Sequence, residues 1–477
     1  MKSFLLYGLV LLSLVACSSE PESRALTRQQ LLDPNTCKEC HPKHYEQWSS
    51  SMHAYAAADP VFLAMNRRGQ EEAKLNDFCV KCHAPMALME GATTDGLNLT
   101  ELPAHLQGVT CYFCHNAVGV EGEHGNGLKL ANDTVMRGGI HDPVEPVVHG
   151  VAYSEFHDRN SSKSSQMCGA CHDFVTPNNV FLERTFAEYK GTLFAKESSL
   201  SFDTCQGCHM EGQYGVVANV PGVPARRLHE HLWPGVDVAL TNFPHREAMR
   251  AAVEECALQN SIQFFSFEFD ASGPTNFVAT LETSAGHSQP SGAAQDRRMW
   301  LEVVAYDAAN NVVYENGRIA DGAIEEPPNG GASAWMFHER MYNARGEPVH
   351  MFWEAAASTQ YPKGYSERAL PGAQTPEAGG HSQSYNYRLP LKLPARVEFR
   401  LRMRPIGLDV LQDLVKSGHL EPAVVPEMPT FTVYSAVAEW TPGTNDPRDF
   451  TVKRTSQPDC ERYRCLYDSS SPGCTNK

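Results

Sequence analysis

The sequence Cys-x-x-Cys-His occurs five times in the first half of this 477-residue chain. Two thiols with two residues between them can each add to one vinyl group of a haem, and a histidine beside the second thiol can ligate the iron from one face. Zinc knuckles and disulfides also use paired cysteines, but neither requires a histidine after every pair. The pattern predicts five covalent c-type haems, attached and ligated by Cys37, Cys40, His41, Cys79, Cys82, His83, Cys111, Cys114, His115, Cys168, Cys171, His172, Cys205, Cys208 and His209.

The N-terminus predicts export. Lys2 precedes an apolar run over residues 4–16, which is too short for a transmembrane helix but suits the core of a signal peptide. The run ends in Leu-Val-Ala-Cys, which resembles the bacterial lipoprotein cleavage box. That resemblance implies a signal peptide over residues 1–16 and lipidation of Cys17. An ordinary cleaved signal with a chance cysteine is the alternative.

The residue after the predicted lipid site is Ser18 rather than aspartate. By the same resemblance, this favours an outer-membrane lipoprotein that faces the periplasm or the cell exterior. Residues 17–32 are polar on the whole and are predicted to form a tether between the lipid and the folded protein.

The mature chain is acidic. Loss of Lys2 leaves 39 of the 40 basic residues against 56 acidic residues, a formal charge of 39 − 56 = −17. Nucleic acid is therefore excluded as a partner, and redox partner proteins with basic surfaces are favoured. An acidic surface that only keeps an exported protein soluble is an equally good interpretation.

The residue pattern of the sequence changes near Cys256, which predicts an α+β chain of several domains. All five haem motifs lie before this point, among Gly, Pro, Asn and Asp clusters and short helical stretches such as residues 183–195. We expect a mainly helical and irregular five-haem domain over residues 33–255. An all-β, sandwich-like domain over residues 256–442 and a cysteine-containing tail over residues 443–477 follow it.

Strand patterns dominate the second half. Every second residue is apolar in residues 396–404, and aromatic residues alternate with polar ones in residues 265–269. Residues 300–306 and 312–314 flank an Asp-Ala-Ala-Asn-Asn turn and predict a hairpin. One helix is expected over residues 406–417, after a proline and before a glycine.

Four cysteines remain after the haem motifs and the lipid site: Cys256, Cys460, Cys465 and Cys474. In an oxidising compartment they can form two disulfides, with three possible connectivities. We favour Cys460 with Cys465 and Cys256 with Cys474, a pairing that joins the tail to the domain junction.

The stretch from Cys37 to His53, with Trp48 between them, resembles the first-haem segment of bacterial multihaem c-type cytochromes related to hydroxylamine oxidoreductase and its tetrahaem electron acceptor. In that segment a tryptophan and a second histidine follow the motif at this spacing. The resemblance covers roughly residues 33–440 and implies a cytochrome rather than one substrate. Further stretches similar to this family are residues 108–115, 149–173, 227–235, 286–292 and 296–300.

The second face of each iron decides between an electron carrier and an enzyme. Ten histidines of the first half lie outside the motifs: His44, His53, His105, His124, His141, His149, His157, His229, His231 and His245. The resemblance favours His53 as a distal ligand, followed by His149, His157 and His231. For the fifth iron, His124, His141 and, from the β part, His287 all stay open.

Three functions are compatible with these observations. The leading one is electron transfer between periplasmic or outer-membrane redox partners by a five-haem lipoprotein. The second is an oxidoreductase that acts on a small nitrogen or sulfur species at one open haem. The third is a structural subunit of a haem filament.

Two arginines of the β part have two interpretations. Arg297 and Arg298 could pair with haem propionates at the domain interface, or they could solvate the edge of a strand.

Overall fold

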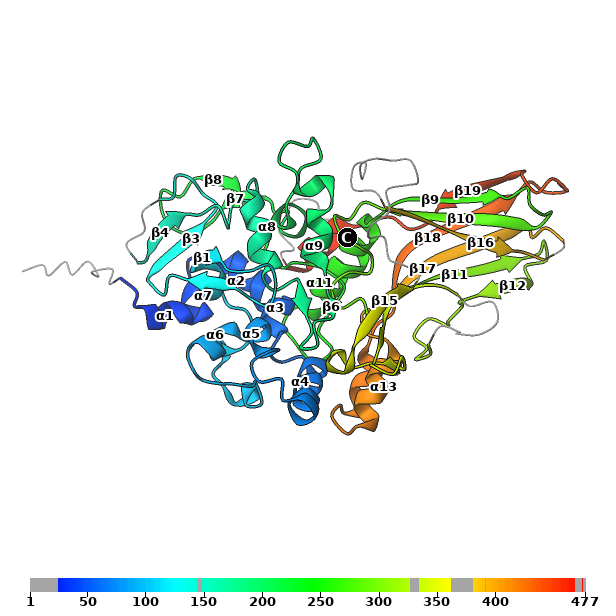
Figure 1. Ribbon diagram of the computed structural model, residues 1–477. Helices are drawn as coiled ribbons and strands as arrows, with labels where there is room; N and C mark the ends of the chain where they lie inside the picture. The colour runs from blue at the N-terminus through cyan, green and yellow to red at the C-terminus, as the bar shows by residue number, and fades with distance from the viewer. Residues whose placement is uncertain are drawn as a thin grey trace, which may run out of the picture.

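The computed structural model describes residues 25–144, 148–326, 334–361, 381–390, 392–467 and 474. Short helices and two-stranded hairpins make up the N-terminal half, and long strands begin at Ile262 (Figure 1). The predicted mixed α+β composition is confirmed. The signal peptide predicted over residues 1–16 and the lipidation site predicted at Cys17 lie outside the described residues.

The helices of the N-terminal half are short, and many of them line a large cavity. Proline opens α2, α4 and α6, where its missing N–H is not needed. The helices are α1 (Arg28–Leu32), α2 (Pro42–Ser49), α3 (Met52–Tyr55), α4 (Pro60–Ala73), α5 (Val80–His83), α6 (Pro85–Met89), α7 (Cys111–His115), α8 (Ser162–Gly169), α9 (Thr185–Lys190), α10 (Cys205–His209), α11 (Arg246–Ala251) and α12 (Leu258–Asn260).

Four two-stranded sheets lie between these helices. The strands of the first pair, β1 and β2, are antiparallel, and those of the second pair, β3 and β4, are parallel. The strands are β1 (Ala117–Val120), β2 (Leu128–Leu130), β3 (Val135–Gly138), β4 (Gly150–Tyr153), β5 (Phe174–Val175), β6 (Phe181–Leu182), β7 (Tyr214–Val216) and β8 (Ala225–Arg227).

The segment expected to be a tether is partly folded. Helix α1 begins after a capping box formed by Thr27 and Gln30, and Leu31 and Leu32 are buried in a hydrophobic cluster. Residues 25–32 are therefore part of the folded unit, and the prediction of a tether is wrong for them. Two adjacent leucines that close a helical turn bury enough apolar surface to dock it.

Two antiparallel sheets form the second half. A three-stranded sheet has the order β16–β10–β9, and an eight-stranded sheet has the order β14–β13–β11–β17–β18–β19, with β12 and β15 paired to β11 and β13. The strands are β9 (Ile262–Phe269), β10 (Asn276–Thr283), β11 (Arg298–Tyr306), β12 (Val312–Asn316), β13 (Trp335–Tyr342), β14 (Pro348–Val349), β15 (Ala357–Tyr361), β16 (His381–Arg388), β17 (Arg396–Arg404), β18 (Phe431–Trp440) and β19 (Phe450–Arg454).

The two sheets pack face to face through aromatic side chains. The ring of Phe267 lies 4.8 Å from that of Phe399, and Phe277 lies 5.6 Å from Trp440. The alternating pattern of β17 buries its apolar residues against β9 and β10, as in a sandwich. The same hydrophobic cluster includes Tyr55 of the N-terminal half. Residues on both sides of the expected boundary near Cys256 therefore share this cluster, and a second cluster lies wholly before the boundary.

The predicted hairpin and helix are both present. Strands β11 and β12 pair across a turn in which the Asp307 carboxylate accepts hydrogen bonds from the backbone N–H groups of Ala309 and Asn311. Helix α13 (Leu408–Lys416) ends before Gly418, whose φ of 79° suits only glycine at little cost.

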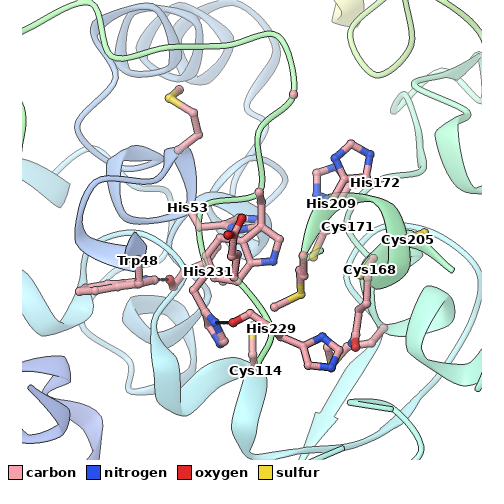
Figure 2. Close-up of a pocket in the computed structure, with 18 of the residues that line it drawn as sticks. Trp48, His53, Cys114, Cys168, Cys171, His172, Cys205, His209, His229 and His231 are labelled. Atoms are coloured by element: carbon pink, nitrogen blue, oxygen red, sulfur yellow. Dashed lines mark hydrogen bonds between the residues drawn. The ribbon is translucent and has the colours of Figure 1, made fainter. Parts of the chain in front are cut away.

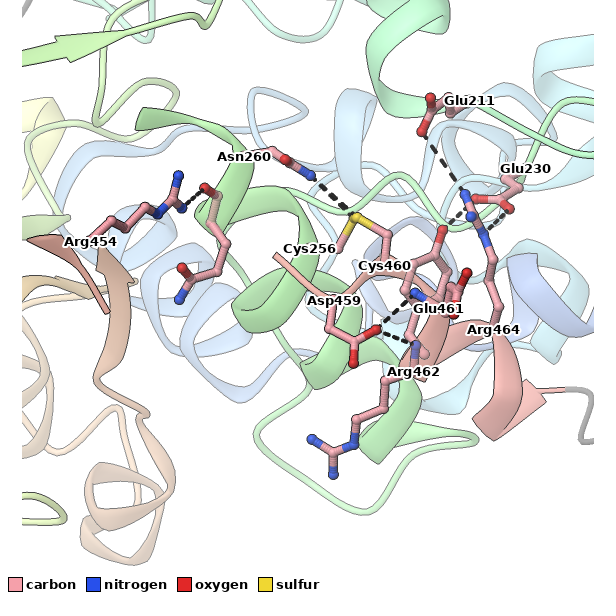
Figure 3. The surroundings of a disulfide bond; sticks show 12 residues. Glu211, Glu230, Cys256, Asn260, Arg454, Asp459, Cys460, Glu461, Arg462 and Arg464 are labelled. Carbon is pink, nitrogen blue, oxygen red and sulfur yellow. Dashed lines mark hydrogen bonds and ion pairs between the residues drawn. A yellow bond between two sulfur atoms is a disulfide. The ribbon is translucent and has the colours of Figure 1, made fainter. Parts of the chain in front are cut away.

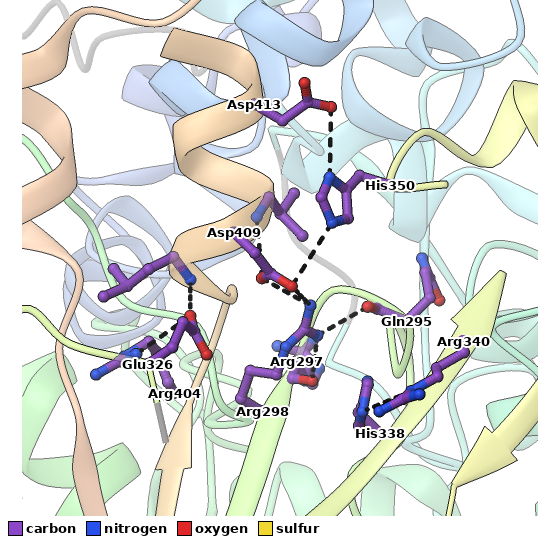
Figure 4. A network of polar contacts seen from close by, with 12 residues as sticks. Gln295, Arg297, Arg298, Glu326, His338, Arg340, His350, Arg404, Asp409 and Asp413 are labelled. Atoms are coloured by element: carbon purple, nitrogen blue, oxygen red, sulfur yellow. Dashed lines mark hydrogen bonds and ion pairs between the residues drawn. The ribbon is translucent and has the colours of Figure 1, made fainter. Parts of the chain in front are cut away.

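A polar network attaches α13 to the sheet (Figure 4), and a further ion pair attaches it to α4. Arg298 donates two hydrogen bonds of 2.8 Å to Asp409, and His350 lies between Asp409 and Asp413. The hydrogen bond to Asp409 raises the pKa of His350. Asp413 also pairs with Arg68 of α4 at 3.1 Å. Arg298 is thus a buried structural residue, neither a strand-edge charge nor free for a propionate.

The disulfides differ from the favoured pairing. Cys256 is bonded to Cys460, and Cys465 is bonded to Cys474. Cys460 and Cys465 both lie in α14 (Cys460–Tyr467), where residues five apart point to different faces and cannot form a disulfide. Helix α14 instead folds back on the π-helix Ala252–Ala257 (Figure 3).

Candidate haem-binding site

A cavity of about 2290 Å³ runs through the N-terminal half and reaches the β sheets. All ten cysteines and all five histidines of the motifs line it. Small-molecule sites commonly measure about 300–1,000 Å³, so the cavity has room for several large cofactors. The ten thiols are free and stand for the thioether sulfurs of the haem-loaded protein.

Local helical structure presents each motif as a unit. Residues Cys111–His115 form α7 and Cys205–His209 form α10. In one helical turn, residues three and four apart share a face, so both thiols and the histidine point to the same side. Thr204 stabilises the start of α10 by accepting a hydrogen bond from the backbone N–H of Gly207.

Four of the five motif histidines face a second histidine from a distant part of the chain. With metal–nitrogen bonds of about 2 Å on both faces of an iron, the ring centres of two axial imidazoles stand about 6 Å apart. Figure 2 shows His53, His231, His172 and His209 turned into the same cavity. The ring-centre distances are 6.4 Å for His41 and His149, 6.2 Å for His172 and His53, 6.1 Å for His115 and His231, and 6.3 Å for His209 and His287.

Most of these rings are oriented by a hydrogen bond between Nδ1 and a backbone carbonyl oxygen. Such a bond sets the tautomer and leaves Nε2 free for a metal. The six bonds are from His41 to Val217, His115 to Arg137, His149 to Gly150, His209 to Pro234, His231 to His229, and His287 to Ser288, at 2.6–3.0 Å.

His83 differs from the other motif histidines. Its Nδ1 lies 3.2 Å from the carbonyl oxygen of Ala56, and its ring is stacked on Phe62 at 4.0 Å. Burial lowers the pKa of His83 to about 4, so the ring is neutral and able to bind a metal. In the part of the chain that the structure describes, no second histidine ring stands opposite His83 at the spacing of the other four pairs.

Two of the histidines named from the sequence also line the cavity but do not face a motif histidine at the axial spacing. His157 lies 5.3 Å from His115, closer than the axial spacing, and its Nε2 is bonded to the carbonyl oxygen of Cys114 at 2.8 Å. Its Nδ1 is buried and has no hydrogen-bond partner among the described residues. His124 is exposed and lies beside Glu123 in a loop.

Two further candidates are also placed away from the axial positions. The ring of His141 is largely exposed and stacks on Tyr153. His44 lies 6.1 Å from His41 but only three residues after it, so it cannot reach around the haem to the opposite face. It packs instead against His231 at 4.7 Å.

Thiols of different motifs lie near one another, which gives the order of the motifs in space. Cys111 lowers the pKa of Cys37, Cys171 lowers the pKa of Cys82, and Cys168 lowers the pKa of Cys205. Cys114 is close enough to raise the pKa of both Cys168 and Cys171. The fourth motif therefore neighbours the second, third and fifth, and the first motif neighbours the third.

Buried carboxyl groups line the side of the cavity near the β sheets. Arg297 donates two hydrogen bonds of 2.9 Å to Asp237, so its guanidinium is engaged by a protein carboxylate. Burial raises the pKa of Glu183 to about 7, of Asp296 to about 7 and of Asp59 to about 6. These groups can exchange protons near neutral pH. Sequence patterns do not reveal them, because only the fold brings them together.

Comparisons with known proteins agree with this site. Residues 36–116 match the family model of cytochrome c554 and c-prime, a span that includes the first three motifs. A penta-haem cytochrome c552 from Thermochromatium tepidum has a similar structure, with a TM-score of 0.54 and 22% sequence identity over 86% of this chain and 98% of that chain. No curated protein matches the sequence. These likenesses and the five motifs support a multihaem c-type cytochrome.

None of the helices among the described residues combines the length and the hydropathy that a membrane span requires.

Proposed function

We propose that this protein transfers electrons through five covalent haems, numbered here in the order of their motifs. The observation that carries the proposal is the set of four histidine pairs at 6.1–6.4 Å, each joining a motif to a distant segment. The proposed distal ligands are His149 for haem 1, His231 for haem 3, His53 for haem 4 and His287 for haem 5. Two histidine ligands occupy both faces of an iron, which suits electron transfer rather than substrate binding.

The proximity of thiols from different motifs supports a branched route. Haem 1 lies next to haem 3, which lies next to haem 4, and haems 2 and 5 both adjoin haem 4. Thioether sulfurs that lie near one another bring the macrocycle edges close together, so electrons can pass between neighbours without a mobile carrier. Haem 4 is then the junction of the route.

The ligand scheme leaves out two histidines that the sequence favoured. His157 lies 5.3 Å from His115, closer than the axial spacing, and His124 is exposed, so neither is proposed as a ligand. For the iron of haem 5, the scheme selects His287 from the three candidates that the sequence left open, because its ring faces His209.

A second function has a specific observation in its favour. His83 stands opposite no other described histidine, so haem 2 is proposed to have an open face. A five-coordinate haem can bind a small nitrogen or sulfur species, and Glu183, Asp296 and Asp59 can hold protons for its reduction. In this version of the proposal, haems 1, 3, 4 and 5 supply electrons to haem 2.

Ligand titration distinguishes the two functions. We expect the oxidised protein to show one high-spin haem beside low-spin haems in its electron paramagnetic resonance (EPR) spectrum, and the reduced protein to bind one carbon monoxide per chain. Turnover of nitrite, hydroxylamine or sulfite at that site would establish the enzyme. Five low-spin haems and no bound carbon monoxide would contradict the enzyme and support electron transfer as the function.

Export and anchoring complete the proposal. The N-terminal apolar run and the Leu-Val-Ala-Cys box support removal of residues 1–16 and acylation of Cys17 at the outer membrane. The acidic charge supports redox partner proteins with basic docking surfaces and argues against nucleic acid.

Denaturing mass spectrometry tests the cofactor number and the anchor together. We expect the mass of the chain from Cys17 onward, increased by five haems and by acyl groups, because thioether bonds and lipid bonds both survive denaturation. Cys17→Ser should lose the acyl mass and keep any haem mass. Fewer than five haems contradicts the haem scheme, whereas five haems without acyl groups contradicts only the anchor.

A further inference from the structure

Trp233 adopts a backbone conformation that tryptophan rarely takes. Its φ is 48°, in the left-handed region, where Cβ crowds the backbone and bulky residues are outliers. Such strain persists only where the surroundings hold the residue, and it is concentrated at functional sites. Trp233 lies two residues after His231 and directly before Pro234, whose carbonyl oxygen binds His209. The strained residue therefore belongs to a segment that contacts the histidines of two haem motifs.

The indole of Trp233 contacts two imidazoles. Its ring centre lies 4.6 Å from that of His53 at an interplanar angle of 75°, and 5.2 Å from that of His231 at 68°. Both are edge-to-face contacts, an arrangement that aromatic rings favour. In the proposed ligand scheme, these imidazoles are the distal ligands of two neighbouring haems, 4 and 3.

His53 has little else to orient it. Six of the eight paired histidines have Nδ1 on a backbone carbonyl oxygen, but within the described ranges neither ring of the pair His53 and His172 has such a bond. This pair is also the one whose rings are crossed. Their planes stand 66° apart, whereas the other three pairs stand 34°, 14° and 17° apart.

We propose that Trp233 is a positioning residue that holds the ring of His53 crosswise to that of His172, and that its left-handed backbone places the indole for this task. The inference rests on the proposed ligand scheme. Crossed axial imidazoles give a low-spin ferric haem a highly anisotropic EPR signal with a large maximal g value, whereas nearly parallel imidazoles give a rhombic signal. Haem 4 is therefore the source of the anisotropic signal.

Trp233→Gly tests the proposal, because glycine accepts a positive φ without strain and only the indole is lost. We expect the variant to keep five haems and to lose the highly anisotropic signal, since His53 is free to rotate. Trp233→Phe retains an aromatic edge and should keep the signal. His245→Gly is the matched control, because His245 has a φ of 50° and contacts Tyr467 instead of a paired histidine. It should leave the spectrum unchanged.

The outcomes separate this inference from the proposed function. A highly anisotropic signal that persists in Trp233→Gly overturns the role of Trp233 and leaves the ligand scheme intact. Absence of that signal from the wild type overturns the crossed geometry. If Trp233→Gly loses haem, the variant Trp233→Leu is used in its place, because leucine supplies bulk without a ring edge. Trp233→Leu should lose the anisotropic signal that Trp233→Phe keeps. The ligand scheme itself fails if His53→Ala produces no new high-spin haem.

Discussion

His53→Ala is expected to keep every covalent haem and to gain one high-spin haem, because the thiols and proximal histidine of haem 4 are untouched while one iron face is opened. Loss of an axial imidazole changes the reduction potential of haem 4. A shift of about 60 mV already changes the equilibrium between neighbouring one-electron carriers about tenfold. Since haem 4 is the proposed junction, we expect electron passage from haem 1 to haem 5 to slow by about tenfold or more. Stopped-flow reduction and EPR spectra measure both effects.

His287→Ala is the matched control for this experiment. It should also add one high-spin haem, but at the end of a branch, so exchange among haems 1, 3 and 4 should continue at the wild-type rate. If His53→Ala keeps the wild-type spectrum, His53 is not a ligand. If His53→Ala leaves electron passage from haem 1 to haem 5 at the wild-type rate, haem 4 is not the junction.

Removal of the disulfide between Cys256 and Cys460 is expected to lower the free energy of unfolding by about 4–5 kcal/mol. The bond joins residues 204 apart in sequence, so it restricts the unfolded chain strongly. It also holds α14 against the N-terminal half, where Tyr463 donates a hydrogen bond of 2.8 Å to the buried Glu230. Denaturant unfolding of the double serine variant, followed by near-ultraviolet circular dichroism, measures the loss.

The second disulfide provides the control. Cys465 and Cys474 are only 9 residues apart, so the corresponding double serine variant should lose about 2–3 kcal/mol. Equal losses in the two variants would show that loop closure does not dominate. No loss in either would show that the tail is not part of the cooperative unit.

The haem-attachment motifs and several local structural elements could be predicted from the sequence alone. Each haem motif places two thiols and a proximal histidine within five residues, so no knowledge of the fold is needed to identify it. The β17 strand was equally clear, because its side chains alternate between a buried and a more open face, and this period is visible in residues 396–404. The same is true of the hairpin whose turn is stabilised by Asp307.

The histidines that face the motif histidines could be identified only from the tertiary structure. His149, His231 and His287 face motif histidines that lie far from them in sequence. Local sequence patterns do not predict contacts between such distant residues. His157 lies in a segment similar to the same family of cytochromes, yet the fold turns its Nε2 to a carbonyl oxygen.

The disulfide pairing and the N-terminal helix α1 also depended on the tertiary structure. Four cysteines allow three pairings, and the choice among them was made by α14, which separates Cys460 from Cys465 and carries Cys460 to Cys256. Residues 25–32 looked polar as a stretch, but Leu31 and Leu32 dock into a cluster formed by later segments. The sequence by itself determined where the haems are attached, because attachment is covalent and local. Only the tertiary structure decided which histidines face four of the motif histidines, because that requires the packing of segments distant in the chain.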